Sequence, residues 1–220
     1  MKTLIFELLF IFLISCNSNK VDNGRIITLK DTLTIHDTVY VDRNSLANWQ
    51  EYFGLTHIPD KDTVWFKQVT YYLDDSQCSG LARDFYYGSL RPSDDGTTDE
   101  LLKLATTDNN KLRPFYRWCL NMTIVVQDGG LAEHTGVPAR KYAEKFPKEF
   151  FEYMDSDTSK QKYNNWASSI GYSGYYNWDD YKRPNNIIIK RLTMTMKNNC
   201  KGCNEKMLRR IDTFAKDCFR

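Results

Sequence analysis

The apolar residues in the second half of the chain recur with the period of a helix. One run of aromatic residues has spacings of four, four and three, which places them on a single helical face: Tyr142, Phe146, Phe150 and Tyr153. Pro138 suits the first turn of this helix. Pro147 lies inside the run, and because proline removes a backbone donor, it predicts a kink or a split into two helices.

The end of the chain predicts an antiparallel helical hairpin. Its first helix spans about 186–199, with one apolar face formed by Ile188, Leu192 and Met196. The second spans about 204–219, has Asn204 as its N-cap, and forms its apolar face from Met207, Ile211, Phe214 and Cys218. A tight elbow, Cys200-Lys201-Gly202-Cys203, joins the two helices.

The pattern between residues 46 and 137 is less regular but still mainly helical. We expect helices separated by glycine, proline and turn-forming residues at 46–53 after Ser45, at 80–90, at 98–105, and from near Pro114 past Met122. Two stretches, 64–73 and 122–126, fit either helix or strand. The sum is an all-α fold, one compact domain of about six to eight helices over residues 46–220.

The chain begins with a run over residues 4–14 that is apolar except for Glu7 and ends in Leu13-Ile14-Ser15-Cys16. At about eleven residues the run is shorter than the roughly 20 that span a bilayer, and it has the length of a signal-peptide core. Its ending resembles the lipobox of bacterial lipoproteins. The resemblance implies that residues 1–15 are removed and that lipid on Cys16 anchors the protein to a membrane. Asn17, where inner-membrane lipoproteins usually have Asp, implies the outer membrane, facing the periplasm or the cell surface.

Residues 16–45 predict an extended tether between the lipid and the domain. They contain a six-residue repeat, Asp31-Thr32-Leu33-Thr34-Ile35-His36 followed by Asp37-Thr38-Val39-Tyr40-Val41-Asp42, in which apolar and polar residues alternate. This alternation is the period of extended chain. We interpret the segment as a spacer or, alternatively, as a strand that is added to the sheet edge of a partner.

Charge excludes one class of partner. The 30 basic and 28 acidic residues leave a net charge of +2, whereas a nucleic-acid-binding protein should have a clear basic excess. We therefore expect no nucleic-acid partner. Beyond the first segment no apolar run approaches membrane-spanning length, so the expected contact with the membrane is through the lipid on Cys16.

Five cysteines remain beyond the lipid site, and an odd number leaves at least one thiol without a partner in the chain. Cys200 and Cys203 form a CxxC, which predicts a local disulfide or, alternatively, a redox pair. Cys203 and Cys218 lie about 22 Å apart along a helix, which is too far for a disulfide. Cys218 must therefore pair with Cys78 or Cys119, or remain a free thiol. A zinc site would need a second CxxC or an HxxxH, so we expect no metal and no cofactor.

One fragment resembles a catalytic motif. Gln77-Cys78-Ser79-Gly80-Leu81 resembles the nucleophile segment of the NlpC/P60 family of cell-wall peptidases, in which a cysteine opens a helix and a downstream histidine acts as base. A helix N-terminus favours the thiolate and an imidazole completes its activation, and the resemblance selects His134 as that base. The family's Gly-rich segment before the cysteine and its strand before the histidine have no counterpart here. A peptidase with catalytic Cys78 and His134 therefore remains the alternative, and our leading hypothesis is that no residue is catalytic.

An aromatic-rich stretch predicts a binding surface, with a loop expected at 171–181. Aromatic side chains of this density stack on sugars, bind a partner protein or complete a core, and the residues concerned are Trp166, Tyr172, Tyr175, Tyr176 and Trp178. Taken with the lipobox and the lack of a full catalytic set, they favour a non-enzymatic, lipid-anchored module. We expect its partner to be an envelope protein or, as in immunity proteins, a toxin.

Overall fold

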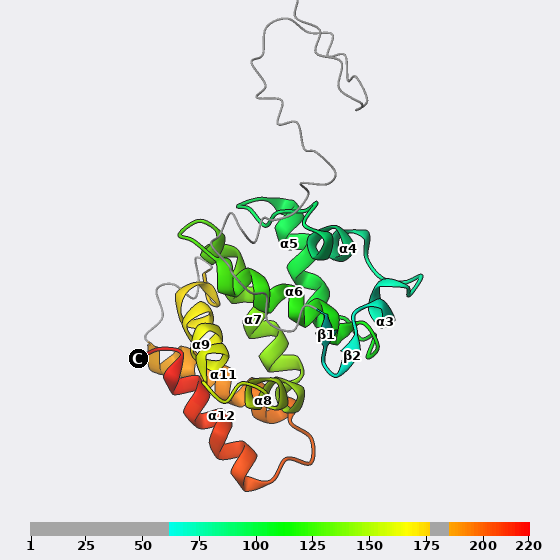
Figure 1. Ribbon diagram of the computed structural model, residues 1–220. Coiled ribbons are helices and arrows are strands. Elements are labelled where there is room, and N and C mark those ends of the chain that lie inside the picture. The colour runs from blue at the N-terminus through cyan, green and yellow to red at the C-terminus, as the bar shows by residue number, and fades with distance from the viewer. Residues whose placement is uncertain (1–61, 177–184) are drawn as a thin grey trace, which may run out of the picture. The chain divides into compact units, whose positions relative to one another are not determined.

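The computed structural model describes residues 62–176 and 185–220, and there the protein is helical, which confirms the all-α prediction (Figure 1). This part contains nine α-helices, one more than the expected range. The helices are α3 Thr70–Leu73, α4 Gly80–Tyr87, α5 Gly96–Lys103, α6 Arg113–Val126, α7 Leu131–Lys145, α8 Pro147–Asp155, α9 Gln161–Ser173, α11 Asn185–Asn199 and α12 Glu205–Asp217. A hairpin of β1 Thr63–Val64 and β2 Lys67–Gln68 precedes them, and a 3₁₀ turn, Leu104–Thr106, follows α5.

Helix α6 lies between two apolar cores and is buried on nearly every side. Phe115, Trp118 and Met122 of α6 pack in an N-terminal core with residues of α3, α4, α5 and the β-hairpin. Leu120 and Ile124 pack in a C-terminal core with residues of α7, α8, α9, α11 and α12. Because its side chains pack into both clusters, α6 connects the two cores.

The two ambiguous stretches have different outcomes. Residues 64–73 contain both structures, because the chain turns back within a short hairpin, pairs Val64 with Lys67, and then forms the single-turn helix α3. Residues 122–126 are the last turns of α6. Their β-branched side chains disfavour a helix only slightly, and burial between the two cores outweighs that preference.

Pro138 lies inside α7 and not at its start, so that prediction is wrong. The helix begins earlier, where Asp128 accepts a hydrogen bond from the first helical amide at 3.0 Å. The hydroxyl of Ser173, from α9, lies against the turn before Pro138. It accepts from the amide of Gly136 at 3.0 Å and donates to the carbonyl of Ala132 at 2.6 Å. Ser173 thus satisfies two backbone groups of α7 in the turn before the proline, which itself removes one helical donor.

The predicted split at Pro147 is confirmed, because α7 ends at Lys145 and α8 begins at Pro147. The aromatic face around it points into the C-terminal core. Tyr142, Phe150 and Tyr153 are buried there, and Phe146 is partly buried against them.

Helices α11 and α12 form the predicted C-terminal hairpin, drawn in orange and red in Figure 1. The amide of Met207 donates to the side chain of Asn204 at 3.0 Å, which confirms Asn204 as the N-cap. Ile188, Leu192 and Met196 from α11 and Ile211 and Phe214 from α12 are buried in the C-terminal core.

The helices predicted at 80–90 and 98–105 are confirmed with different bounds, as α4 and α5. Helix α4 ends at Tyr87, and Gly88 after it has the left-handed backbone typical of a helix end (φ 80°). Helix α5 is capped by Asp95, which accepts from the amide of Thr98 at 2.9 Å. Helix α9 was not predicted from the sequence, and because it extends to Ser173, the loop predicted at 171–181 begins later. The predictions for residues 1–53 lie outside the described residues.

Candidate binding surfaces

Cys78 and His134 contact different hydrogen-bond partners in the structure. Cys78 lies just before α4, is 5% exposed, and its Sγ donates to the carbonyl of Ser79 at 3.8 Å. Burial raises the pKa of the Cys78 thiol, whereas a nucleophilic cysteine needs a lowered pKa. Among the described residues, no hydrogen bond joins Cys78 to His134.

His134 is held by two carboxylates instead. Its Nδ1 lies 2.8 Å from an oxygen of Asp99, and its Nε2 lies 2.5 Å from an oxygen of Asp94. The hydrogen bond to Asp99 is the largest contribution to a raised pKa of the imidazole, and Asp94 adds to it. Both ring nitrogens donate only in the protonated ring. When it is protonated, the ring therefore ties α7 to Asp99 of α5 and to Asp94 just before that helix, and both of its nitrogens are occupied.

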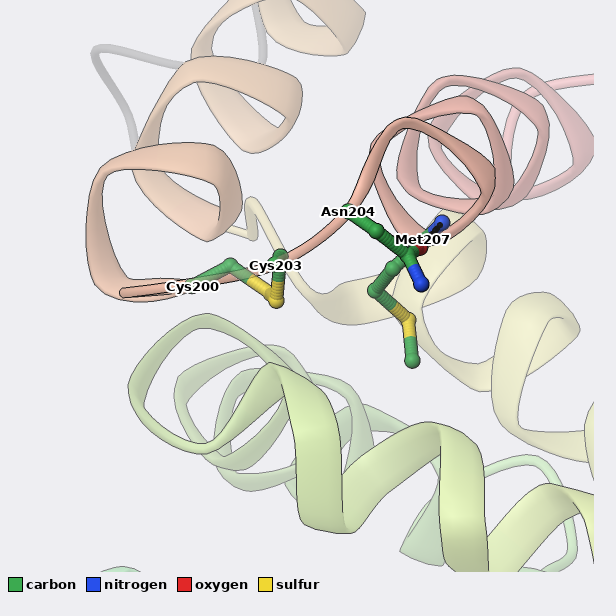
Figure 2. The surroundings of a disulfide bond; sticks show 4 residues. All are labelled: Cys200, Cys203, Asn204 and Met207. Atoms are coloured by element: carbon green, nitrogen blue, oxygen red, sulfur yellow. Dashed lines mark hydrogen bonds between the residues drawn. A yellow bond between two sulfur atoms is a disulfide. The ribbon is translucent and has the colours of Figure 1, made fainter.

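Cys200 and Cys203 form a disulfide at the turn between α11 and α12 (Figure 2), with their Cα atoms 5.5 Å apart. Gly202 within this turn has a left-handed backbone (φ 68°), which favours glycine. Cys200 is buried, and both cysteines pack against the C-terminal core. Cys78, Cys119 and Cys218 are free and buried.

The structure divides the aromatic residues that the sequence nominated for partner binding. Trp166 is fully buried and Tyr175 is 6% exposed, so both are core residues and are not available to a partner. Tyr172 and Tyr176 are more than half exposed. Trp178 lies outside the described residues.

A groove of about 490 Å³ lies between α9, the first residue of α11 and the end of α12. Its α9 wall consists of Asn164, Ala167, Ser168, Gly171 and Tyr172. A Cβ on Gly171 would overlap the carbonyl oxygen of Cys218, so glycine is what allows the end of α12 to approach α9. On the opposite wall, Asp217 accepts a hydrogen bond from Tyr163 at 2.9 Å and pairs with Arg220 at 2.9 Å.

A second exposed feature is the tip of the β-hairpin, where Trp65 and Phe66 connect β1 to β2. Both residues have left-handed backbones, with φ of 48° and 64°. This conformation matches the twist of a two-residue hairpin but usually needs Asn or Gly, and it costs about 1–2 kcal/mol for each other residue. The Phe66 side chain is 80% exposed. The turn therefore presents a large apolar ring to solvent from a strained backbone.

The ring of Trp65 anchors this turn on the body of the protein. The buried guanidinium of Arg117 contacts two neighbouring rings, at 4.4 Å from the centroid of Trp65 and 4.0 Å from that of Tyr153. Arg117 donates to the hydroxyl of Tyr142 at 2.9 Å, but its Nε and Nη2 have no hydrogen-bond partner among the described residues. A desolvated cation–π contact is worth about 2 kcal/mol. Arg117 therefore fixes Trp65, and Trp65 fixes the orientation of Phe66.

Sequence reasoning missed the Trp65–Phe66 turn because the segment contains none of the residues that mark a two-residue hairpin. Over residues 62–176 and 185–220, no group of three or more His, Cys, Asp or Glu side chains is placed to hold a metal ion. No helix in the same residues is long and apolar enough to cross a membrane. No protein-family model, curated protein or solved structure matches the chain.

Proposed function

We propose that this protein is a lipid-anchored, non-enzymatic module of the bacterial cell envelope that binds another protein through the Trp65–Phe66 turn. The lipid on Cys16 would hold it at the outer membrane, and the partner would be an envelope protein or a toxin. The observation that carries the proposal is the exposed ring of Phe66 on a strained turn. Strained backbone persists only where surrounding contacts enforce it, and it is frequent at binding sites.

The energetics of the turn suit a contact with a partner. Burying a phenylalanine side chain is worth roughly 1.5–3 kcal/mol, and a single aromatic ring that enters a pocket is typical of the residues that dominate an interface. Two contacts hold the turn in place before binding. The Trp65 ring packs on the guanidinium of Arg117, and the Tyr72 hydroxyl donates to the carbonyl of Val64 at 2.9 Å. Less conformational freedom is then lost on association.

The test is site-specific photo-crosslinking in cells, with the photoreactive residue in place of Phe66 in one strain and in place of Tyr172 in another. Tyr172 is the matched control, because it is also exposed but belongs to α9. In Figure 1, α9 lies at the left and the β1–β2 hairpin at the right. We expect a discrete protein adduct from position 66 and none from position 172. Adducts of the same size from both positions, or from neither, would refute the proposal.

Once the partner is identified, Phe66→Ser should lower its affinity by tenfold or more, since about 1.4 kcal/mol corresponds to tenfold. Tyr172→Ser should leave the affinity unchanged. A toxin partner predicts in addition that cells that carry Phe66→Ser lose protection against it, whereas an envelope-protein partner predicts no such phenotype.

The competing proposal, a Cys78–His134 peptidase, has weaker support. It requires a nucleophile and a base within hydrogen-bonding reach, whereas His134 contacts Asp94 and Asp99, and Cys78 contacts Ser79. It predicts that Cys78→Ser abolishes activity on peptidoglycan fragments. The binding proposal predicts no such activity in either protein.

A further inference from the structure

The groove beside α9 has walls whose polar groups are not used within the protein. Side chains of Asn164, Ser168 and Asn185 line it, and none of the three makes a hydrogen bond to any residue that the structure describes. The ring of Tyr172 is 59% exposed and does not stack on another ring of the described residues. Two carboxamides, a hydroxyl and a phenol are thus free to bind a ligand.

The charge of the groove is balanced. Its charged side chains, Asp217 and Arg220, pair with each other at 2.9 Å, and the other carboxylate oxygen of Asp217 accepts from the hydroxyl of Tyr163. An anionic ligand such as a phosphate would need cations that are not already paired. An apolar peptide segment would need a larger apolar surface, whereas the described lining offers the Tyr172 ring, Ala167, Cys218 and the partly buried ring of Phe219.

The floor of the groove is small and rigid. Ala167 and Gly171 leave space on the α9 wall, and the carbonyl of Cys218 lies directly against Gly171. The volume of about 490 Å³ falls within the roughly 300–1,000 Å³ of sites for small ligands. The groove also opens to solvent at the exposed ring of Tyr172, so a chain longer than one unit can extend out of it.

We infer that this groove binds a neutral glycan, with one sugar ring stacked on Tyr172 and its hydroxyl groups bonded to Asn164, Ser168 and Asn185. A pyranose ring has an apolar C–H face and a rim of hydroxyls that both donate and accept hydrogen bonds. Tyrosine offers an aromatic face with a polar end, and carboxamides donate and accept at the same time. This inference is independent of the Trp65–Phe66 turn, which belongs to a different element.

The test is isothermal titration calorimetry of the full chain with two neutral oligosaccharides, cellotetraose and chitotetraose. We expect at least one of them to bind, and Tyr172→Ala to weaken that binding by about tenfold, since the stacking contact is lost. Asn164→Ala should weaken binding by about fivefold, because one or two hydrogen bonds are lost. A thermal unfolding curve of each variant checks that the fold is intact, and both positions are exposed in α9.

Phe66→Ser is the matched control, since it removes an exposed aromatic ring outside the groove. It should leave oligosaccharide binding unchanged, and Tyr172→Ala should leave the crosslink from position 66 unchanged, so the two proposals fail separately. Absence of binding to both oligosaccharides at millimolar concentration would overturn the inference. Equal losses from Tyr172→Ala and Phe66→Ser would also overturn it, because they would show non-specific stacking on exposed rings.

Discussion

Replacing Gly136 by alanine tests how closely α7 and α9 are packed. A Cβ built on Gly136 would lie 2.5 Å from the carbonyl oxygen of Ser169 and closer still to the hydroxyl of Ser173 and the amide nitrogen of Gly174. Two of these three obstacles are backbone atoms of α9, which a change of rotamer cannot move. The alanine variant must therefore push the two helices apart.

The magnitude follows from three contributions. Forcing an extra methyl group into a packed interior costs typically 1–3 kcal/mol, and backbone obstacles place Gly136 at the upper end. Separation also breaks the hydrogen bond of 3.0 Å from the Gly136 amide to the hydroxyl of Ser173, which is worth about 1 kcal/mol. The higher helix propensity of alanine offsets about 1 kcal/mol of this loss in stability. We expect a net loss of about 3 kcal/mol.

The assay is urea unfolding followed by tryptophan fluorescence, together with thermal unfolding by circular dichroism. For a domain of this size the loss should lower Tm by about 6–12 °C. Gly80→Ala and Gly96→Ala are the controls, since each glycine opens a helix and a Cβ there would meet nothing within 4 Å. Both should stay within about 0.5 kcal/mol of the wild type. A Gly136→Ala variant as stable as these controls would refute the close approach of α7 and α9.

Three further predictions concern charge, covalent links and the anchor. The pKa of His134 is raised above its usual 6.5. The protonated ring therefore stabilises the folded state fully below about pH 6.5, and this stabilisation disappears as the pH rises through the folded-state pKa. The free energy of unfolding of His134→Gln in urea should differ from that of the wild type at about pH 5.5 and converge with it at about pH 9. The Cys200–Cys203 disulfide closes a loop of only four residues. The Cys200→Ser/Cys203→Ser double variant should therefore lose about 2 kcal/mol of unfolding free energy in the same assay and remain folded. A collapse of the helical signal would contradict this. Cys16→Ser should abolish incorporation of labelled palmitate and release the protein from the membrane fraction, and an unchanged distribution would exclude lipidation at Cys16.

The candidate catalytic pair Cys78 and His134 shows what spacing along the chain does not decide. Cys78 and His134 occur in the order that a cysteine peptidase needs, but order along the chain does not place side chains in space. Asp99 of α5 and Asp94 just before that helix occupy both nitrogens of His134. Only the packing of α5 against α7 determines this arrangement.

The sequence by itself determined most of the helices, although not α9 or the start of α7, because helix formation depends largely on local features that a short window contains. The apolar face of α12, its cap at Asn204 and the break at Pro147 are each fixed by residues within one or two turns. The lipobox at Cys16 is also a local feature, and the near-neutral charge is a sum over residues, so both can be read without the tertiary structure. Lipidation at Cys16 remains a prediction. Tertiary structure decided which aromatic rings are exposed. Trp166 and Phe66 are both large apolar side chains, yet the first is fully buried and the second is 80% exposed, because burial is set by helices far away in the chain.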